Sequence, residues 1–255
     1  MSRDISYLLR QWPFDAEKFQ VRTIMGDSGR ELIQVRLDLG MIQMELEGRP
    51  DGTSPEGFES HLDRYAHLAG EAGGAGRTFA LDQEDCELLM REGVQYYYRY
   101  YAAFHLNRYE VVVRDTDRNL RLFDFVVEHA TRNRDKLRFD QFRPYVIMMR
   151  SRAKASISLD TSDYPAAIES VDEGIGAIRE FLRKYGHEED EAQCSELGFL
   201  LRWRADLERE KPKGPVDELR QQLDLAVAIE DYEEAAKIRD QIQRLQDGGP
   251  SAGHP

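Results

Sequence analysis

The amino-acid sequence predicts a mainly α-helical protein in three parts. Near the N-terminus apolar residues alternate with polar ones, which is the period of a β-strand; beyond residue 77 they recur at helical spacing. A chain of 255 residues is long enough for one large domain or two small ones. We expect a small β-rich module at residues 1–69, a stack of paired helices at residues 78–210, and a helical hairpin at residues 215–246.

The N-terminal part is expected to form three antiparallel strands joined by glycine turns. The alternation changes phase at Gly40, which predicts a bulge or a sharp bend there. Residues 48–52, with the sequence GRPDG, form a predicted turn, because Pro fixes φ and Gly permits positive φ. The two apolar sets are Ile33, Val35, Leu37 and Leu39 before the change and Ile42, Met44 and Leu46 after it. A sheet with one covered face follows, and then a short helix at residues 57–68.

Residues 70–77, with the sequence GEAGGAGR, have the composition of a flexible linker. Beyond this segment we expect five long helices, at residues 84–107, 109–130, 141–160, 164–185 and 191–210. A second linker, KPKGP, precedes the hairpin.

One short pattern occurs three times in the helical part. Tyr109, Tyr164 and Tyr232 each begin a helix, and a small or β-branched residue follows three positions later: Val112, Ala167 and Ala235. This resembles the tetratricopeptide pattern, in which such residues let paired helices approach closely. The first two tyrosines are 55 positions apart, whereas a regular array has a period of about 34. The resemblance implies an irregular tetratricopeptide-like helical stack of two to three units, capped by the β module or by a partner.

Five tyrosines lie in the segment YYYRYY at residues 96–101. They could stack bases or line a peptide groove. Helical spacing spreads them around most of the helix, however, and a helix that is apolar nearly all round usually lies at the centre of a stack. We therefore favour a core position over a groove.

The C-terminal hairpin is predicted from two short amphipathic segments. Asp231 stands where an N-cap is needed, with Glu234 three residues later, and residues 248–250 (GGP) end the second helix. One apolar face carries Leu219, Leu223 and Ala226, with Val216 and Val227 at its edges; the other carries Ala235, Ile238, Ile242 and Leu245. Two helices this short bury little apolar area and need a partner, either in this chain or in another protein.

The second half of this hairpin resembles the UVR motif of bacterial excinuclease subunits B and C. The motif reads as an aromatic, Glu, any residue, Ala-Ala, any residue, an aliphatic, Arg-Asp, any residue and Ile. The matching residues are Tyr232, Glu233, Ala235, Ala236, Ile238, Arg239, Asp240 and Ile242. Tyr232 replaces the more usual Phe, and Val227 stands where Ala is common.

The UVR resemblance implies a protein-interaction module without a catalytic role. In the family it joins the two excinuclease subunits, and it also occurs in the activator of a bacterial protein-arginine kinase and in Clp-type chaperones. The eight matching residues are accordingly the expected partner-binding residues. Glu233, Arg239 and Asp240 suggest charged pairing with a second hairpin, on a partner or on another copy of the chain; the alternative is that they are solvated surface charges.

The formal charge of −13 disfavours non-specific binding to nucleic acid. Residues 108–154 nevertheless hold twelve Lys or Arg and seven Asp or Glu, a net +5, so the rest of the chain carries −18. This basic stretch could bind an acidic partner or a nucleic acid through Arg132, Arg134 and Arg138, or it could be neutralised by the acidic flanks of the same chain. We favour internal pairing.

No pattern in the sequence predicts catalysis, a cofactor or a metal. The segment from Asp115 to Asn119 resembles the start of a calcium loop but has Leu120 where Gly is required. The acidic run after His187 lacks metal-ligand spacing, and no phosphate-binding glycine loop or nucleophile elbow occurs. Cys86 and Cys194 are isolated and expected to be reduced, and the apolar runs are too short to span a membrane, so we expect a cytoplasmic protein.

These observations favour a non-catalytic bacterial adaptor that docks partner proteins through the hairpin and a surface of the helical stack. A first alternative is an accessory factor in nucleotide excision repair that contacts DNA through residues 108–154. A second is a regulator of a protein-arginine kinase or a Clp protease, although the CxxC pairs expected of the kinase activator are absent.

Overall fold

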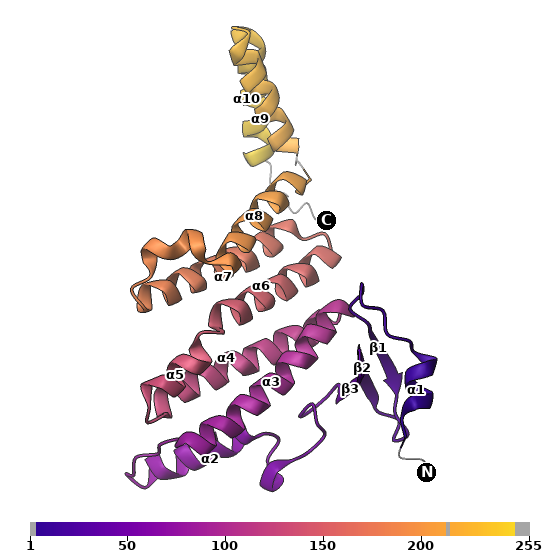
Figure 1. The fold of residues 1–255 in the computed structure, drawn as a ribbon. Helices are drawn as coiled ribbons and strands as arrows, with labels where there is room; N and C mark the ends of the chain where they lie inside the picture. Colours follow the sequence, from indigo (N-terminus) through magenta and orange to yellow (C-terminus); the bar gives the residue numbers. More distant parts are fainter. Residues whose placement is uncertain (1–3, 213–214, 248–255) are drawn as a thin grey trace, which may run out of the picture. The chain divides into compact units, whose positions relative to one another are not determined.

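The computed structural model describes residues 4–212 and 215–247, and it divides into two compact units. The boundary between the two units lies between Leu207 and Glu208. The predicted combination of a helical stack, a small N-terminal antiparallel sheet and a C-terminal hairpin is confirmed (Figure 1).

The N-terminal sheet has three antiparallel strands in the order β1-β2-β3: β1 Val21–Met25, β2 Glu31–Leu37 and β3 Gly40–Glu45. The predicted bend at Gly40 is a complete chain reversal, with Asp38 and Leu39 forming the turn and Leu37 opposite Gly40. Residues that lie directly opposite share a face, so Val35 pairs with Ile42 across the strands. This register explains why the apolar set changes from odd to even residue numbers.

The expectation of a single covered face is wrong. On the second face the Arg22 guanidinium donates to the Gln34 side chain at 2.7–2.9 Å, and Gln34 donates to Gln43 at 2.8 Å, which forms a polar ladder across all three strands. Arg36 Nε donates to the carbonyl of Trp12 at 2.7 Å, and the Arg22 guanidinium lies 4.1 Å from the Trp12 ring. The N-terminal segment therefore covers part of the polar face, over Arg22 and Arg36.

The first unit contains two 3-10 helices, η1 Pro55–Gly57 and η2 Glu188–Gln193, in addition to its α-helices. The α-helices are α1 Ser6–Gln11, α2 His61–Gly74, α3 Gln83–His105, α4 Tyr109–His129, α5 Asn133–Asp140, α6 Arg143–Asp160, α7 Tyr164–Lys184 and α8 Ser195–Glu210, whose last three residues belong to the second unit. Helices α3, α4, α6 and α7 pack in that order as successive rows (Figure 1). The hairpin helices of the second unit are α9 Pro215–Ala228 and α10 Tyr232–Asp247.

The sheet and the helical stack share one hydrophobic core. Ile33, Val35 and Met44 are buried in the same cluster as Tyr100 and Val171. The segment predicted as a linker also belongs to the fold, because α2 continues to Gly74 and is followed by Gly76, which has φ +68°. The sheet and the helices up to Leu207 accordingly lie within the first compact unit.

The three tyrosine patterns mark one recurring turn. Before each tyrosine stands a residue with positive φ: Asn107 (56°), Ser162 (59°) and Glu230 (60°). In all three turns the N–H of the next residue donates at 2.9 Å to the carbonyl five residues earlier, which satisfies one of the free carbonyls at the end of the preceding helix. Val112, Ala167 and Ala235 are buried in the resulting helix pairs. The turns join α3 to α4, α6 to α7 and α9 to α10.

Helix α5 was not predicted, because it is short and lies within a polar segment. Its last residue, Asp140, is buried and connects three helices. Its carboxylate accepts from the hydroxyl of Tyr185 at 2.5 Å, lies 3.3 Å from Lys184 Nζ, and pairs with Arg143. Burial opposes ionisation of this carboxyl, but the Tyr185 hydrogen bond and the Arg143 charge outweigh it and hold the pKa of Asp140 below its usual value.

A lowered pKa in the folded state makes Asp140 a source of stability that is present above about pH 4, the usual pKa, and is lost as the pH falls through the folded value. We expect Asp140→Asn to lower the free energy of unfolding at pH 7, and the difference from wild type to shrink as the pH falls below about 4. Urea unfolding of both proteins across this pH range measures the effect. A difference that does not depend on pH would show that the ionised carboxylate contributes nothing.

Candidate functional site

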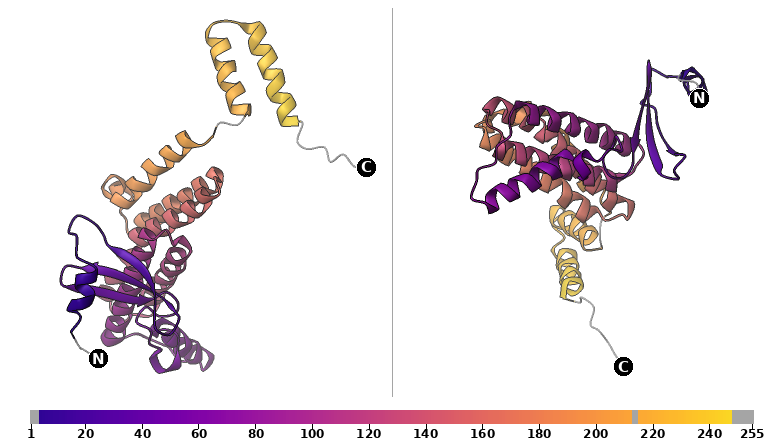
Figure 2. Two further views of the ribbon diagram at one scale, coloured as in Figure 1. Left: turned by 90° about the vertical axis from the view of Figure 1, so that its right-hand side faces the viewer. Right: turned by 90° about the horizontal axis from the view of Figure 1, so that it is seen from below.

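The C-terminal hairpin is held together by a small core of its own. Ala226 on α9 packs with Ala235, Ile238 and Ile242 on α10, and Leu219 and Leu223 close the sides. The two helices lie side by side and are joined by one tight turn (Figure 2). The Asp231 carboxylate accepts from the Glu234 N–H at 3.0 Å, as an N-cap should, while the Asp231 N–H donates to the carbonyl of Ala226. The cap is therefore formed. The side chain of Val216 and residues 248–250 lie outside the described residues.

The residues of the UVR pattern divide into two groups in the structure. Ala235, Ile238 and Ile242 are covered by the hairpin itself, so these three hold its helices together. The outward group consists of Tyr232, Glu233, Ala236, Arg239 and Asp240, all of them exposed. The UVR pattern alone does not distinguish the residues that pack the hairpin from those that face outward.

Large apolar side chains are exposed on the outer surface of the hairpin. Tyr232 is 68% exposed, Leu225 is 66% exposed and Ile229 is 74% exposed, although all three lie on or next to a short, packed hairpin. Val227 and Leu245, expected at the edges of the core, are each half-exposed. Such a concentration of exposed apolar side chains is typical of an interaction surface.

Charges surround these apolar side chains. Arg239 Nη2 lies 3.8 Å from the Asp240 carboxylate, and both side chains are more than half exposed. Glu233 lies 3.1 Å from Lys237 Nζ within the same helix. Exposed pairs of this kind contribute about 0–1 kcal/mol to folding, so Arg239 and Asp240 remain available to a partner at little cost to the hairpin.

The basic stretch at residues 108–154 is largely paired within the chain. Seven of its twelve cations lie within ion-pair distance of a carboxylate: Arg108, Arg114, Arg118, Arg132, Arg143, Arg150 and Lys154. Several of the carboxylates, including Glu31, Glu47 and Glu92, come from the acidic residues before the stretch. This arrangement supports the prediction of internal neutralisation.

The three arginines predicted as anion contacts are in different situations. Arg132 donates to Asp135 at 2.6 and 3.0 Å and to Gln83 at 2.7 Å, so its guanidinium is occupied. Arg134 and Arg138 are exposed on α5, one turn apart, and neither forms an ion pair within the described part of the chain.

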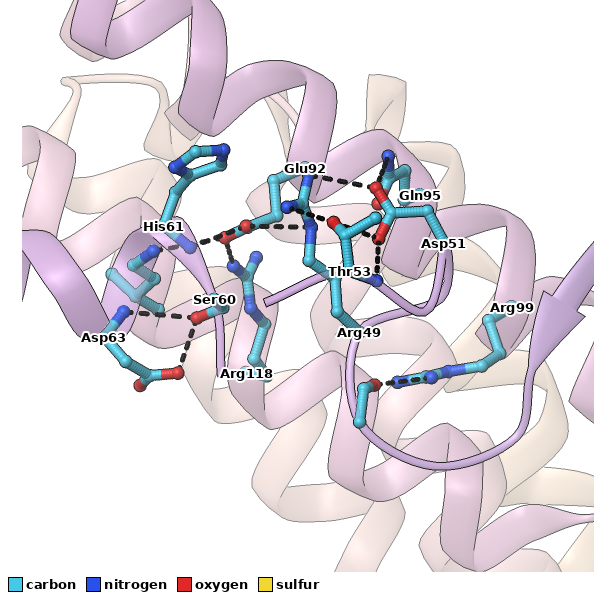
Figure 3. A network of polar contacts seen from close by, with 12 residues as sticks. Arg49, Asp51, Thr53, Ser60, His61, Asp63, Glu92, Gln95, Arg99 and Arg118 are labelled. Atoms are coloured by element: carbon cyan, nitrogen blue, oxygen red, sulfur yellow. Dashed lines mark hydrogen bonds and ion pairs between the residues drawn. The ribbon is translucent and has the colours of Figure 1, made fainter. Parts of the chain in front are cut away.

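A buried polar network joins α2, α3 and α4 to the segment after β3 (Figure 3). The Glu92 carboxylate on α3 is fully buried and accepts from the backbone N–H of His61 at 2.7 Å and of Leu62 at 3.2 Å, so it caps the N-terminus of α2. Arg118 on α4 donates to the same carboxylate, and Arg49 lies 3.4 Å from it.

Arg99 is the second centre of this network. It forms a two-bonded pair with Asp115 at 2.7 and 2.9 Å, and its third nitrogen donates to the carbonyls of Glu45 and Gly48 at 3.0 and 2.7 Å. Both charged side chains are 1% exposed. Asp115, the first residue of the rejected calcium loop, is therefore a structural ion-pair partner. Tyr96 packs beneath the guanidinium groups of Arg99 and Arg118.

The tyrosine segment at residues 96–101 divides between core and surface. Tyr96 and Tyr100 are buried, as expected of a central helix, but Tyr98 is 44% exposed. Residues 4–212 and 215–247 contain no cluster of three His, Cys, Asp or Glu side chains able to hold a metal ion. None of the helices in these ranges is long and apolar enough to cross a membrane.

Comparison with known proteins identifies one motif. Residues 213–248 match the family described as UvrB/uvrC motif, so the chain carries a UVR motif over α9 and α10. No curated protein and no solved structure matches the chain. The match covers the hairpin and leaves residues 1–212 without an assigned relative.

The division of the UVR pattern predicts that two neighbouring substitutions differ in their effect on hairpin stability. Ala235→Leu should destabilise the hairpin by about 1–3 kcal/mol, because it overpacks the contact between α9 and α10. Ala236→Leu should have little effect, because Ala236 is exposed. Hydrogen exchange of the amides in residues 215–247, measured in the full-length chain, reports on the hairpin alone. Equal protection in both variants would contradict the packing described above.

The buried pair predicts a large loss of stability in the first unit. Arg99→Ala should lower the free energy of unfolding by about 3–5 kcal/mol, because it leaves the Asp115 carboxylate buried without its main partner. Arg179→Ala is the matched control: it removes an exposed pair with Glu191 and should cost about 0–1 kcal/mol. Urea denaturation of the three proteins compares these losses. Similar losses in both variants would indicate that the Arg99 site is hydrated.

Proposed function

We propose that this protein is a non-catalytic adaptor of the bacterial cytoplasm, which binds a partner protein through the outward face of its C-terminal hairpin. The observation that carries the proposal is the division of the UVR motif. Its inward residues complete the hairpin, so the exposed Tyr232, Arg239 and Asp240 are free to be recognised. The partner would cover the apolar side chains that the hairpin leaves exposed.

The organisation of the chain supports this role. The hairpin has its own core and belongs to a compact unit distinct from residues 1–207, so it can act as an appended module. A docking role also requires no reactive group, and the buried charged residues of the first unit are engaged in structural pairs.

The alternative of a DNA-binding repair factor has less support. Contact with phosphate requires exposed cations that are free of carboxylates, and most cations of residues 108–154 already have partners. Regulation of a kinase or a protease remains compatible with an adaptor, since either enzyme could be the partner of the hairpin.

Substitution on the outward face tests the proposal. Arg239→Glu should leave the melting temperature nearly unchanged, because the side chain is 71% exposed and only weakly paired. It should weaken partner association by at least about tenfold, which corresponds to about 1.4 kcal/mol. The immobilised full-length chain would first be used to retain proteins from a bacterial lysate, and the protein that is retained would then be purified and titrated against wild type and variant.

Two controls make the result specific. Arg244→Glu changes an exposed arginine of the same helix that lies outside the UVR pattern, and it should bind normally. Deletion of residues 215–255 should abolish the association and leave the first unit folded, as measured by calorimetry. Equal binding by wild type and Arg239→Glu, or unfolding of the first unit on truncation, would refute the proposal.

A further inference from the structure

The first unit contains an apolar pocket between α3, α4 and α6 that its own core does not fill. The pocket encloses about 440 Å³. Its floor includes Tyr100, Leu122 and Phe139, each at most 1% exposed. A pocket of this size and composition is typical of a binding site that receives large apolar groups.

The rim of the pocket is made of large apolar side chains that remain open to solvent. Val94 is 39% exposed, Tyr98 is 44% exposed and Phe142 is 47% exposed. Val94 and Tyr98 lie one turn apart on the same side of α3, and Phe142 directly precedes α6. An apolar floor and an apolar exposed rim together indicate a surface that is covered by another molecule.

Two shallower hollows extend this surface toward positive charge. The first shares Met90 and Val94 with the pocket and adds Arg91 and Arg138. The second begins at Arg138 and includes Arg134. We refer to the pocket rim (Val94, Tyr98, Phe142) together with Arg91, Arg134 and Arg138 as the α3–α5 face.

The arginines of the α3–α5 face are free to receive an anionic ligand. Arg91, Arg134 and Arg138 are exposed, and none of the three forms an ion pair within residues 4–212 and 215–247. Two carboxylates line the hollows: Asp140 is engaged by Arg143, Lys184 and Tyr185, while Glu87 stands beside Arg91. The face is therefore positive, in a chain whose total charge is −13.

We propose that the α3–α5 face is a second docking site, which binds an acidic segment of a partner protein. One large apolar side chain of that segment, aromatic or leucine, would enter the pocket, and neighbouring carboxylates would pair with Arg91 and Arg138. The inference rests on the adaptor role proposed above and extends it to a surface far from the UVR motif in sequence. A chain with two such sites would hold two proteins together.

The geometry favours a peptide over a nucleic acid. Single strands are bound by a row of stacking aromatics along a groove with many cations. Here an apolar pocket has exposed cations on one flank, which suits an anchor residue followed by carboxylates. Arginine also matches the planar carboxylate with two parallel hydrogen bonds.

The test uses the full-length chain and a defined probe: a labelled, capped peptide with Phe and Leu one helical turn apart among Asp and Glu residues. Fluorescence anisotropy should show saturable binding. Replacing Phe and Leu by Ala, or every acidic residue by its amide, should each weaken binding by at least about tenfold.

Variants of the chain locate the site. Val94→Glu and Arg138→Glu should each weaken binding of the probe by at least about tenfold, through loss of the apolar rim and loss of the cation respectively. Arg121 is exposed on α4 and lines none of these hollows, so the Arg121→Glu variant should bind the probe as tightly as wild type does. Circular dichroism confirms that each variant is folded. Arg239→Glu should also bind the probe normally, so failure of this site can be distinguished from failure of the hairpin proposal.

Several results would overturn the inference. These are the absence of saturable binding, equal affinity in Arg138→Glu and wild type, and tighter binding of a mixed-sequence single-stranded oligonucleotide than of the peptide. Self-association of the chain that is lost in Val94→Glu, seen by sedimentation, would assign the face to a second copy instead.

Discussion

The buried guanidinium of Arg99 is the interaction on which the first unit depends. Its two-bonded pair with Asp115 holds α3 against α4, and its remaining hydrogen bonds go to the carbonyls of Glu45, at the end of β3, and of Gly48 after it. One side chain therefore fixes the sheet, the turn and two helices at a single point. Seven residues earlier on the same helix, Glu92 caps the N-terminus of α2. A buried ion pair of this kind contributes little net free energy to folding. It does disfavour other packings of the helices and the sheet, because in those packings the charge would be buried without a partner.

The helical part of the fold could be predicted from the sequence because its signals are local. Tyr109 and Tyr164 mark the starts of α4 and α7, and the turn before each of them depends on residues within one helical turn. The register of the sheet also follows from the change in apolar phase at Gly40. Helix α5 and the helical end of α2 were missed, because a short polar helix and a glycine-rich helix end look like loops in composition.

The pairing of charges could not be predicted in the same way. Arg99 stands in a row of tyrosines, and nothing in that row indicates that Asp115, sixteen residues later, lies against it. Internal pairing of the positive residues 108–154 was expected from the acidic flanks, but the individual partners Glu31, Glu47 and Glu92 could not be identified because they are distant in sequence. For the hairpin, the motif identified the module, but which of its residues face outward depends on the angular positions of Ala235 and Ala236 in a packed pair of helices.

The same separation of packing from recognition recurs in both units. In the hairpin, small and branched residues close the core and leave Tyr232 and Arg239 outside. In α3, Tyr96 and Tyr100 are used for packing, while Tyr98 and Val94 stand at the rim of an open pocket. A helix that packs on one side only has a second side available for binding, and the shared turn geometry produces such helices repeatedly. Because the inward residues fix each fold, the outward residues can change with the partner at small cost in stability, which is the property an adaptor requires.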